Sequence, residues 1–346
     1  MKTRREHVEA AFQRRKAGRL ACFPLVDVAY ASAHQGAAMS RAQLDPEWHA
    51  RALMQCVQDL PTDGVYVNLC LSPEQAQRAV CHADRYSVAI DDCLEVQIPI
   101  NDVASIAQTD VRNLDDPRIE TAELFHPGML ATFRQMPREA KDQAAIFAGL
   151  TGTFSQLAFL IGLENLLVAM VDDPERVQRA LRRRHKVVRR QAVALCEAGA
   201  RFVWIGEGMA SGSLISPRMY QEFVLPYEQE LADVLRDHGA WSVLHICGNA
   251  TPMLPWMGAS RVDGCDLDYL TDWPAAVRTL GTRLVLKGNI NPMLLLPENQ
   301  QNLAEACQQT KRLAGDAPGF ILSTGCLVPR DADPSAFEIM AKTCAL

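Results

Sequence analysis

The chain has 346 residues, 48% of them apolar, and a formal net charge of −6. This length can bury a large core, and a single α/β barrel accommodates it as readily as two smaller domains. The negative charge argues against nucleic acid or an anionic membrane as the main partner. No apolar stretch reaches the roughly 18 residues that span a bilayer, and residues 1–6 lead into a charged amphipathic helix, not a signal sequence. We therefore expect a cytoplasmic enzyme with no membrane segment.

Short apolar runs rich in β-branched residues alternate with longer segments of helical period, and no linker divides them. Eight runs are predicted to be strands: 22–28, 64–69, 144–151, 201–206, 241–246, 264–268, 283–287 and 320–323. Eight strands alternating with helices are what a closed (β/α)8 barrel needs. The predicted fold is a single TIM-barrel domain over residues 1–346, in which residues 1–20 form an amino-terminal helical extension.

Between the strands, residues 164–198 are predicted to form one or two long helices, 217–238 another, and 302–313 the helix before the last strand. Ser216 followed by Pro217 is a typical helix start. The irregular, proline-containing region 91–138 is interpreted as an insertion near the barrel mouth or a β-hairpin excursion. The basic run at 182–190 favours a solvated helix face, with attraction of an acidic partner as the alternative.

Chemistry in such a barrel takes place at the carboxyl ends of the strands. Polar residues end five consecutive predicted strands: Glu207, then His245 with Cys247, Asp266 with Asp268, Asn289 with Asn291, and Cys326. A cluster of polar strand ends indicates a reaction site at this end of the barrel.

His245 and Cys247 lie two residues apart on one strand, so their side chains point the same way. Alone, such a pair is more often core packing than a metal site. Cys326, at the equivalent end of another strand and after Gly325, adds a third soft ligand, and one imidazole with two thiolates is a set that Zn²⁺ prefers. Cys265 is a rival ligand, but its alternation with Asp266 and Asp268 predicts that the acids face the interior.

The chain contains 11 cysteines, scattered without paired spacings, so we expect reduced thiols and no disulfide framework. The remaining cysteines are interpreted as core or surface thiols: Cys22, Cys56, Cys70, Cys81, Cys93, Cys196, Cys307 and Cys344.

Several motifs resemble the uroporphyrinogen decarboxylase superfamily, and within it the zinc-dependent corrinoid methyltransferases. They are the His-x-Cys-Gly-Asn of 245–249, the Gly-Asn-Ile-x-Pro of 288–292, the Ser-Thr-Gly-Cys of 323–326 and the stretch 216–226. The likeness covers nearly the whole length, including 4–27. The decarboxylase itself is disfavoured, because nothing after Phe23-Pro24 supplies its arginine-rich amino-terminal motif with Gln-Ala-Gly-Arg.

The resemblance implies a zinc ion held by His245, Cys247 and Cys326, with one position open to substrate. Glu207 either fills that position in the resting enzyme or is a solvated loop acid. The resemblance also implies catalytic roles for Glu207 and Asn289, and a pocket to which these residues are assigned: Asn249, Tyr220 with Tyr227, Asp268 and Asn291.

The two aspartates at the end of the sixth predicted strand have two possible roles, and position 291 differs from the superfamily. Asp266 and Asp268 are either acceptors for the His245 ring N–H or members of interior salt bridges. The superfamily usually has an aspartate at the position of Asn291, and an amide there cannot act as a base.

The expected activity is methyl transfer between a methylated corrinoid protein and a small thiol such as coenzyme M. The partner would present the methylcorrinoid, a cobalamin, over the barrel mouth, and a homodimer is compatible with the sequence. One alternative runs from an O-methyl or S-methyl donor to the corrinoid protein. Others are a methionine synthase-like folate and thiol enzyme, a uroporphyrinogen decarboxylase-like enzyme, and a non-enzymatic barrel stabilised by zinc.

Overall fold

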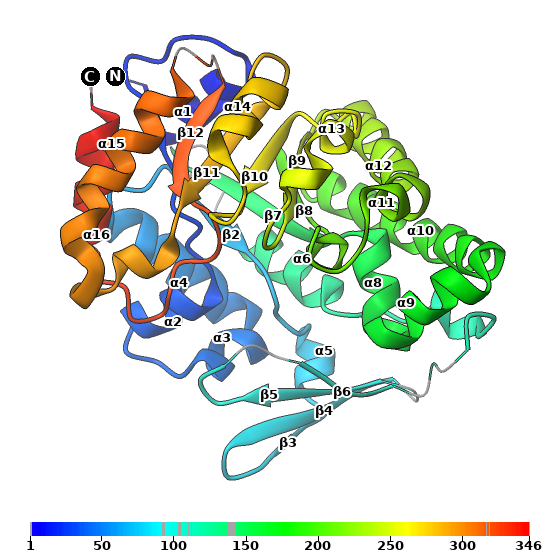
Figure 1. Cartoon of the computed structure of the whole chain (residues 1–346). Helices are drawn as coiled ribbons and strands as arrows, with labels where there is room; N and C mark the ends of the chain where they lie inside the picture. The colour runs from blue at the N-terminus through cyan, green and yellow to red at the C-terminus, as the bar shows by residue number, and fades with distance from the viewer. Residues whose placement is uncertain are drawn as a thin grey trace.

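The computed structural model describes residues 2–91, 94–102, 105–109, 111, 113–136, 143–315, 317 and 319–345. Its centre is an eight-stranded parallel sheet, curled with helices on its outer side (Figure 1). The strands are β1 (Ala21–Cys22), β2 (Gly64–Val67), β7 (Ala145–Thr151), β8 (Phe202–Gly206), β9 (Trp241–Ile246), β10 (Gly264–Leu267), β11 (Val285–Ile290) and β12 (Phe320–Thr324). The predicted TIM barrel is confirmed.

The order β1-β12-β11-β10-β9-β8-β7-β2 leaves β1 and β2 at the two ends of the sheet. These ends meet, because the Asp63 amide donates to the Cys22 carbonyl (2.8 Å) and the Tyr66 amide to the Val26 carbonyl (2.9 Å). The buried Asp63 carboxylate also accepts from the Cys22 amide (2.8 Å) and from both terminal nitrogens of Arg19.

Most helices lie between or after the strands, and several of them begin at a capping side chain, such as Asp45 before Pro46 and Ser216 before Pro217. The helices are α1 (Arg4–Phe12), α2 (Val28–His34), α3 (Met39–Leu44), α4 (Pro46–Asp59), α5 (Pro73–Ala76), α6 (His126–Gln135), α8 (Thr153–Ile161), α9 (Leu163–Asp172), α10 (Pro174–Glu197), α11 (Pro217–Phe223), α12 (Leu225–Asp237), α13 (Leu254–Met257), α14 (Trp273–Leu280), α15 (Leu303–Ala314) and α16 (Pro334–Cys344). Short 3₁₀ turns are η1 (Pro117–Glu120), η2 (Gly208–Ala210), η3 (Thr251–Met253), η4 (Pro292–Leu295) and η5 (Pro297–Asn302). Prolines in first turns fit helix starts, where no amide donor is needed.

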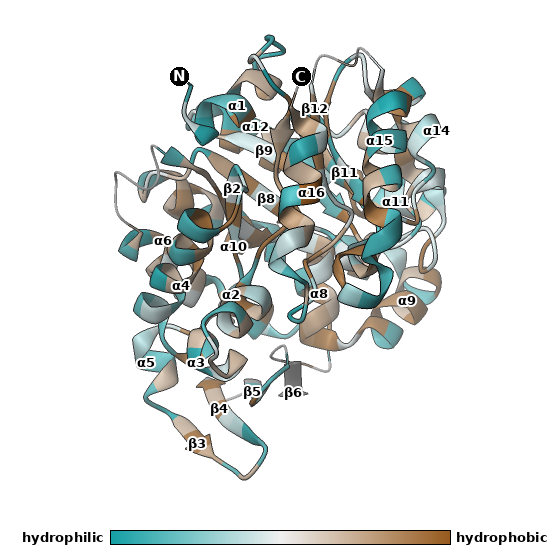
Figure 2. Cartoon of the chain, turned by 90° about the vertical axis from the view of Figure 1, so that its left-hand side faces the viewer, coloured by the Kyte–Doolittle hydropathy of each residue, from teal (hydrophilic) through white to brown (hydrophobic). Residues whose placement is uncertain are grey.

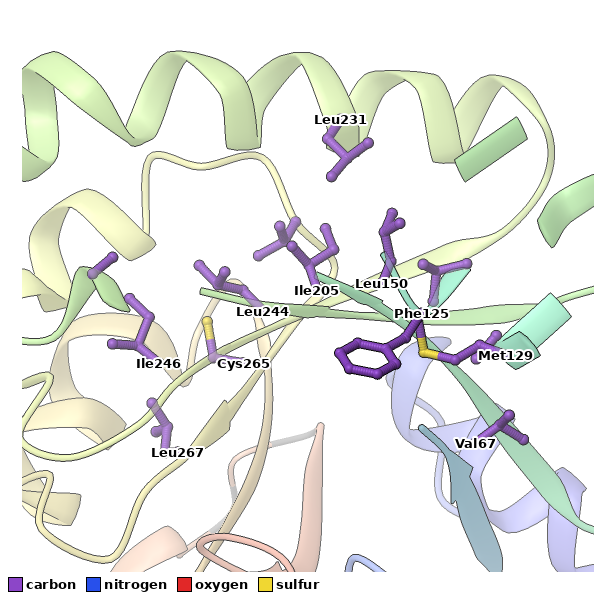
Figure 3. Close-up of a cluster of buried hydrophobic side chains, with 14 of the residues drawn as sticks. Val67, Phe125, Met129, Leu150, Ile205, Leu231, Leu244, Ile246, Cys265 and Leu267 are labelled. Carbon is purple, nitrogen blue, oxygen red and sulfur yellow. The ribbon is translucent and has the colours of Figure 1, made fainter. Parts of the chain in front are cut away.

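Two apolar layers hold the barrel together. The interior layer contains Phe147, Phe202 and Val243, and α1 closes its amino-terminal end, where the Phe12 ring lies 5.3 Å from Phe202 and 5.4 Å from Trp241. The outer layer lies between the strands and the helices, and Figure 3 shows Leu231 of α12 reaching toward the strand side chains. Outer turns of helices such as α15 are hydrophilic (Figure 2).

Four predictions about the elements need correction. The predicted strand 22–28 is short, because the chain turns at Pro24 and Asp27 caps α2 by accepting from the Ala29 amide. The single helix predicted over 217–238 is two helices that meet at Val224, before Pro226, which cannot donate a helical hydrogen bond.

The predicted insertion has different boundaries and contains more regular structure. It begins with an antiparallel four-stranded sheet of β3 (Ala79–Cys81), β4 (Arg85–Asp91), β5 (Leu94–Pro99) and β6 (Ser105–Thr109), which lies to one side of the barrel (Figure 1). The second part contains α6, which packs on α4, β2 and β7 as a barrel helix. Cys93 lies outside the described residues.

The basic run on α10 is not simply solvated. Arg184 is fully buried, and its Nη1 donates to the carbonyls of Ile119 (3.1 Å) and Ala122 (2.8 Å). Arg183 pairs with Glu120 at 2.7 Å. The prediction of a solvated face is therefore wrong for these two residues. Their acceptors come from η1 and its neighbours and, for Arg184, also from Gln156 of α8.

In the described part of the chain, no single helix is both long and apolar enough to cross a bilayer. Helices α8 and α9 satisfy that criterion only as a pair, and they meet at a bend of 106°.

A buried carboxyl group lies in the outer layer between α11 and α12. The Tyr220 hydroxyl donates to Glu228 Oε2, while Glu228 Oε1 has no partner in the described structure. Burial raises the pKa of Glu228 well above its ordinary value. The folded protein therefore favours the protonated carboxyl group.

Replacing Asp63 with alanine is expected to lower the free energy of unfolding by about 3 kcal/mol, because the Cys22 amide and the Arg19 guanidinium lose their acceptor. Urea denaturation measures the change. Glu47→Ala removes only an exposed partner of Arg51 and should have little effect. Equal losses in the two variants would show that Asp63 does not hold the sheet ends together.

Glu228→Gln should stabilise the protein increasingly as pH rises. A carboxyl group with a raised folded pKa contributes its full stability below the unfolded pKa of about 4.3 and loses it as pH rises toward the folded value. Glutamine cannot ionise and still accepts from Tyr220. Urea denaturation between pH 5 and 8 should show the wild type falling behind by up to about 1.4 kcal/mol per pH unit. A difference independent of pH would contradict this account.

Candidate metal centre

The structure brings the three predicted metal ligands together at the carboxyl ends of the strands. His245 belongs to β9, Cys247 follows β9, and Cys326 follows β12. Their ligand atoms all lie within 4.8 Å of one another, and His245 Nε2 is 3.2 Å from Cys247 Sγ. Within the described ranges this is the only group of at least three such side chains. Whether it binds zinc remains a prediction.

The His245 ring is held in one orientation from two sides. Its Nδ1 lies 2.9 Å from the Asp266 carbonyl, and because a carbonyl only accepts, Nδ1 must carry the proton. The Trp204 ring stacks on the imidazole with centroids 4.8 Å apart. His245 Nε2 is therefore left with its lone pair on the side of the two thiols, as metal binding requires.

The Asp266 carboxylate has a different partner. It accepts from Lys287 Nζ at 3.0 Å through both oxygens and from Trp204 Nε1 at 2.8 Å. Of the two roles considered for Asp266, the carboxylate forms the interior salt bridge, while the backbone carbonyl holds the His245 ring. Cys265 lies in the outer layer, so the predicted alternation is confirmed (Figure 3).

The two thiols differ in acidity. A hydrogen bond from the Cys247 thiol lowers the pKa of Cys326 to about 4, and the same thiol pairing raises the pKa of Cys247. One thiolate is thus already favoured without any metal. An imidazole and two cysteine sulfurs, one of them anionic, fit Zn²⁺.

Glu207 is buried, so the alternative of a solvated loop acid is wrong. Its carboxylate accepts from the amides of Phe154 (3.1 Å) and Ser155 (2.9 Å) at the start of α8. Burial raises the pKa of Glu207 to about 7. A Cβ atom at Gly152 would lie 2.1 Å from Oε1, so this glycine makes room for the carboxylate. The Glu207 carboxylate therefore lies at the start of α8 and is not among the clustered ligand atoms.

Asp268 and Asn289 fix the loops beside the ligands. Asp268 Oδ2 accepts from the Gly248 amide at 2.9 Å, directly after Cys247. Asn289 Nδ2 donates to the carbonyl of Thr271 at 3.1 Å. Both predicted residues therefore lie at the carboxyl ends of the strands. Asp268 holds the loop that carries Cys247, and Asn289 holds the loop after β10.

Asn249 and Asn291 make local turns. Asn249 is exposed and accepts from the Thr251 amide at 3.0 Å. Asn291 accepts from the Met293 amide at 3.0 Å and begins η4. An amide oxygen serves this cap as well as a carboxylate does, so the replacement of the usual aspartate leaves the turn intact.

The assignment of Tyr220 and Tyr227 to the pocket is wrong. Tyr220 has no exposed surface and lies in the outer layer with its hydroxyl on Glu228. The Tyr227 hydroxyl lies 3.1 Å from Gln178 Oε1 on α10. Helices α11 and α12 cover the outside of the barrel, so their buried side chains pack between the helices and the strands and do not reach the barrel interior.

Sequence reasoning missed the aromatic floor below the ligands, which consists of Tyr66 and Trp204. Their ring centroids are 4.6 Å apart. Trp204 lies two residues before Gly206, on the interior side of its strand, and a Cβ at Gly206 would lie 2.7 Å from the indole. One sequence signal could have indicated this floor: a glycine lies two residues from the aromatic residue in both strands, as in Gly64 and Tyr66 of β2 and Trp204 and Gly206 of β8.

Comparisons with known proteins give a family and a fold. A family model described as Uroporphyrinogen decarboxylase (URO-D) matches residues 3–345. A methylcobamide:CoM methyltransferase of Methanosarcina acetivorans is 32% identical over 136 residues, which is 39% of each chain. A methylated-thiol–coenzyme M methyltransferase of Methanosarcina mazei is 26% identical over 203 residues, which is 57% of this chain and 54% of that protein. The matches thus span about two fifths to half of these curated relatives.

A solved structure described as a methyltransferase from Methanosarcina mazei has a TM-score of 0.82 and 18% identity, over 99% of this chain and 98% of that one. It shows the same fold.

Alanine at His245, Cys247 or Cys326 should weaken zinc binding on the order of 100-fold or more, because each substitution removes one of three ligands. Competition with a chromophoric chelator measures the affinity. Cys265→Ala, which removes a thiol of the outer layer, should keep one zinc ion per chain. Loss of zinc in Cys265→Ala alone would overturn the assigned ligand set.

Proposed function

The chain belongs to the uroporphyrinogen decarboxylase family, and from that premise we propose that it is a zinc-dependent methyltransferase acting between a methylated corrinoid protein and a small thiol such as coenzyme M. The observation that carries the proposal is the convergence of His245, Cys247 and Cys326 at the mouth of the barrel. The two relatives named as coenzyme M methyltransferases support it.

The three side chains would hold the metal, and when bound there Zn²⁺ would lower the pKa of an incoming thiol and keep it as a nucleophilic thiolate. The protein contributes orientation. The Asp266 carbonyl and the Trp204 ring fix the imidazole, and Asp268 fixes the turn after Cys247. Asn289 ties down the neighbouring loop and is assigned a positioning role. Fixed ligands reduce the reorganisation that substrate binding requires.

Glu207 is retained as a candidate catalytic group and fourth ligand. Its amide donates to the His245 carbonyl at 2.9 Å, so its loop is attached to a ligand strand. To become a ligand, its carboxylate would have to give up the amides of Phe154 and Ser155. The two arrangements are alternatives for one carboxylate, which suits a position that substrate can take.

Exposed apolar side chains around the mouth support docking of a partner protein. They lie in the loops after β8, β10 and β11: Leu214, Tyr269, Leu270 and Met293. A protein that presents a methylcorrinoid to the ligands must cover this rim. Clusters of exposed apolar residues mark protein contacts more often than free surface.

The reverse half-reaction is the second candidate. In it, a methylated thiol or an O-methyl compound donates its methyl group to the corrinoid protein. The similarity to the methylated-thiol–coenzyme M methyltransferase of Methanosarcina mazei favours this candidate. The same three ligands would then lie beside the sulfur or oxygen that leaves.

The test is an assay of methyl transfer from free methylcobalamin to coenzyme M by the zinc-loaded protein. The loss of methylcobalamin absorbance measures the rate. Wild type and Cys265→Ala should be active, and Cys326→Ala should fall to the uncatalysed rate. Homocysteine as acceptor and methyltetrahydrofolate as donor test the methionine synthase-like alternative. Methyl transfer from the folate but not from methylcobalamin would contradict the proposal and support the methionine synthase-like alternative. Release of carbon dioxide from uroporphyrinogen would support a decarboxylase instead.

A further inference from the structure

The Tyr66 side chain points from β2 into the interior of the barrel. It belongs to the interior layer and is 6% exposed. A Cβ atom at Gly149 would lie 2.9 Å from its hydroxyl, so the absence of a side chain on the neighbouring strand gives the phenol its place. The position of the Tyr66 ring therefore depends on two strands: β2, which carries it, and β7, which carries Gly149.

The Tyr66 hydroxyl has no hydrogen-bond partner in the described parts of the chain, and it is not among the fully enclosed polar atoms. Its neighbours are occupied. Trp204 Nε1 donates to Asp266, and the Asp27 carboxylate accepts from Asn68 at 2.9 Å. A mostly buried hydroxyl without a partner is unfavourable unless something else satisfies it. Because the oxygen is not fully enclosed, the hydroxyl is accessible to a molecule that enters the barrel.

The hydroxyl belongs to the same space as the candidate ligands. Trp204 touches both sides, with its ring 4.6 Å from Tyr66 and 4.8 Å from His245. The ligands come from β9 and β12, whereas Tyr66 comes from β2 on the other side of the strand order. A molecule beside the ligands is therefore bordered by Tyr66.

The phenol is a donor at all ordinary pH values. Burial raises the pKa of Tyr66 well above its usual range, and the negative charges of Asp27 and Cys326 act in the same direction. Each of these groups would be repelled by a phenolate.

We propose that Tyr66 is a substrate-binding residue whose hydroxyl donates a hydrogen bond to an oxygen of the thiol substrate. The substrate class is then a short thiol that carries a hydroxyl, carboxylate or sulfonate oxygen. This inference rests on the proposed function and deepens it. Apolar contact with the Trp204 and Tyr66 rings would hold the carbon atoms between sulfur and oxygen.

Tyr66→Phe removes the hydroxyl and keeps the ring in its contact with Trp204. Isothermal titration calorimetry of the zinc-loaded protein should show binding of 2-mercaptoethanol and coenzyme M weakened about tenfold, the effect of losing one net hydrogen bond. Ethanethiol has no oxygen, so its affinity should not change. Zinc content and melting temperature should match the wild type, which separates substrate binding from a structural role.

Tyr30→Phe is the matched control, because the Tyr30 hydroxyl is also without a partner but lies in the outer layer. It should leave all three affinities unchanged. Equal binding of the three thiols by Tyr66→Phe and wild type would overturn the assignment of Tyr66 alone. If wild type bound no thiol, the proposed function would fall and the assignment with it. Equal weakening for ethanethiol would show that Tyr66 acts only through packing.

Discussion

A fully buried lysine joins β12, which leads to Cys326, to β10, which holds the His245 ring. Lys287 Nζ on β11 donates to both oxygens of Asp266 on β10 and, at 2.7 Å, to Ser323 Oγ on β12. The Asp266 backbone holds the His245 ring, and Ser323 precedes Cys326 by three residues. An uncompensated buried charge is costly, so the barrel is stable only when these strands are in register. The register that satisfies Lys287 is also the one that brings the ligands together.

Interior glycines are the second constraint on the site. Glycine occupies positions 149, 152 and 206, where a Cβ atom would collide with Tyr66, Glu207 and Trp204 respectively. Barrel interiors are normally filled by branched apolar residues. Here large polar and aromatic groups take that volume, at the level directly below the strand ends. The glycines therefore make room for the Tyr66 and Trp204 rings and the Glu207 carboxylate near the three candidate ligands.

Local patterns predicted what depends on neighbouring residues. The bounds of β9 and the outward direction of Cys265 followed from alternation along a strand. The meeting of Cys326 with His245 followed from a barrel rule that puts all carboxyl strand ends at one edge. The role of Asn291 as a cap could also have been predicted from the proline that follows it.

Contacts across the chain were not predictable in this way. Two acceptors of Arg184, the carbonyls of Ile119 and Ala122, lie more than sixty positions away, and nothing in a basic run indicates them. Tyr220 failed for a related reason, because a helix pattern shows which residues are buried but not which of two apolar layers receives them. Tyr66 was missed because its importance depends on a glycine of another strand.

Glu207 shows how the fold links its helices to the site. The start of α8 provides amide donors and a positive dipole end, which together favour a carboxylate. Burial acts in the opposite direction and raises the pKa of Glu207 to about 7, so the carboxylate is held without being strongly stabilised. Its backbone is attached to His245 at the same time. The Glu207 carboxylate is thus bound by backbone amides, whereas the Asp266 carboxylate is fixed by its ion pair with Lys287. The proposed exchange of Glu207 therefore requires the start of α8 to release the carboxylate, whereas Asp266 orients His245 from a fixed position.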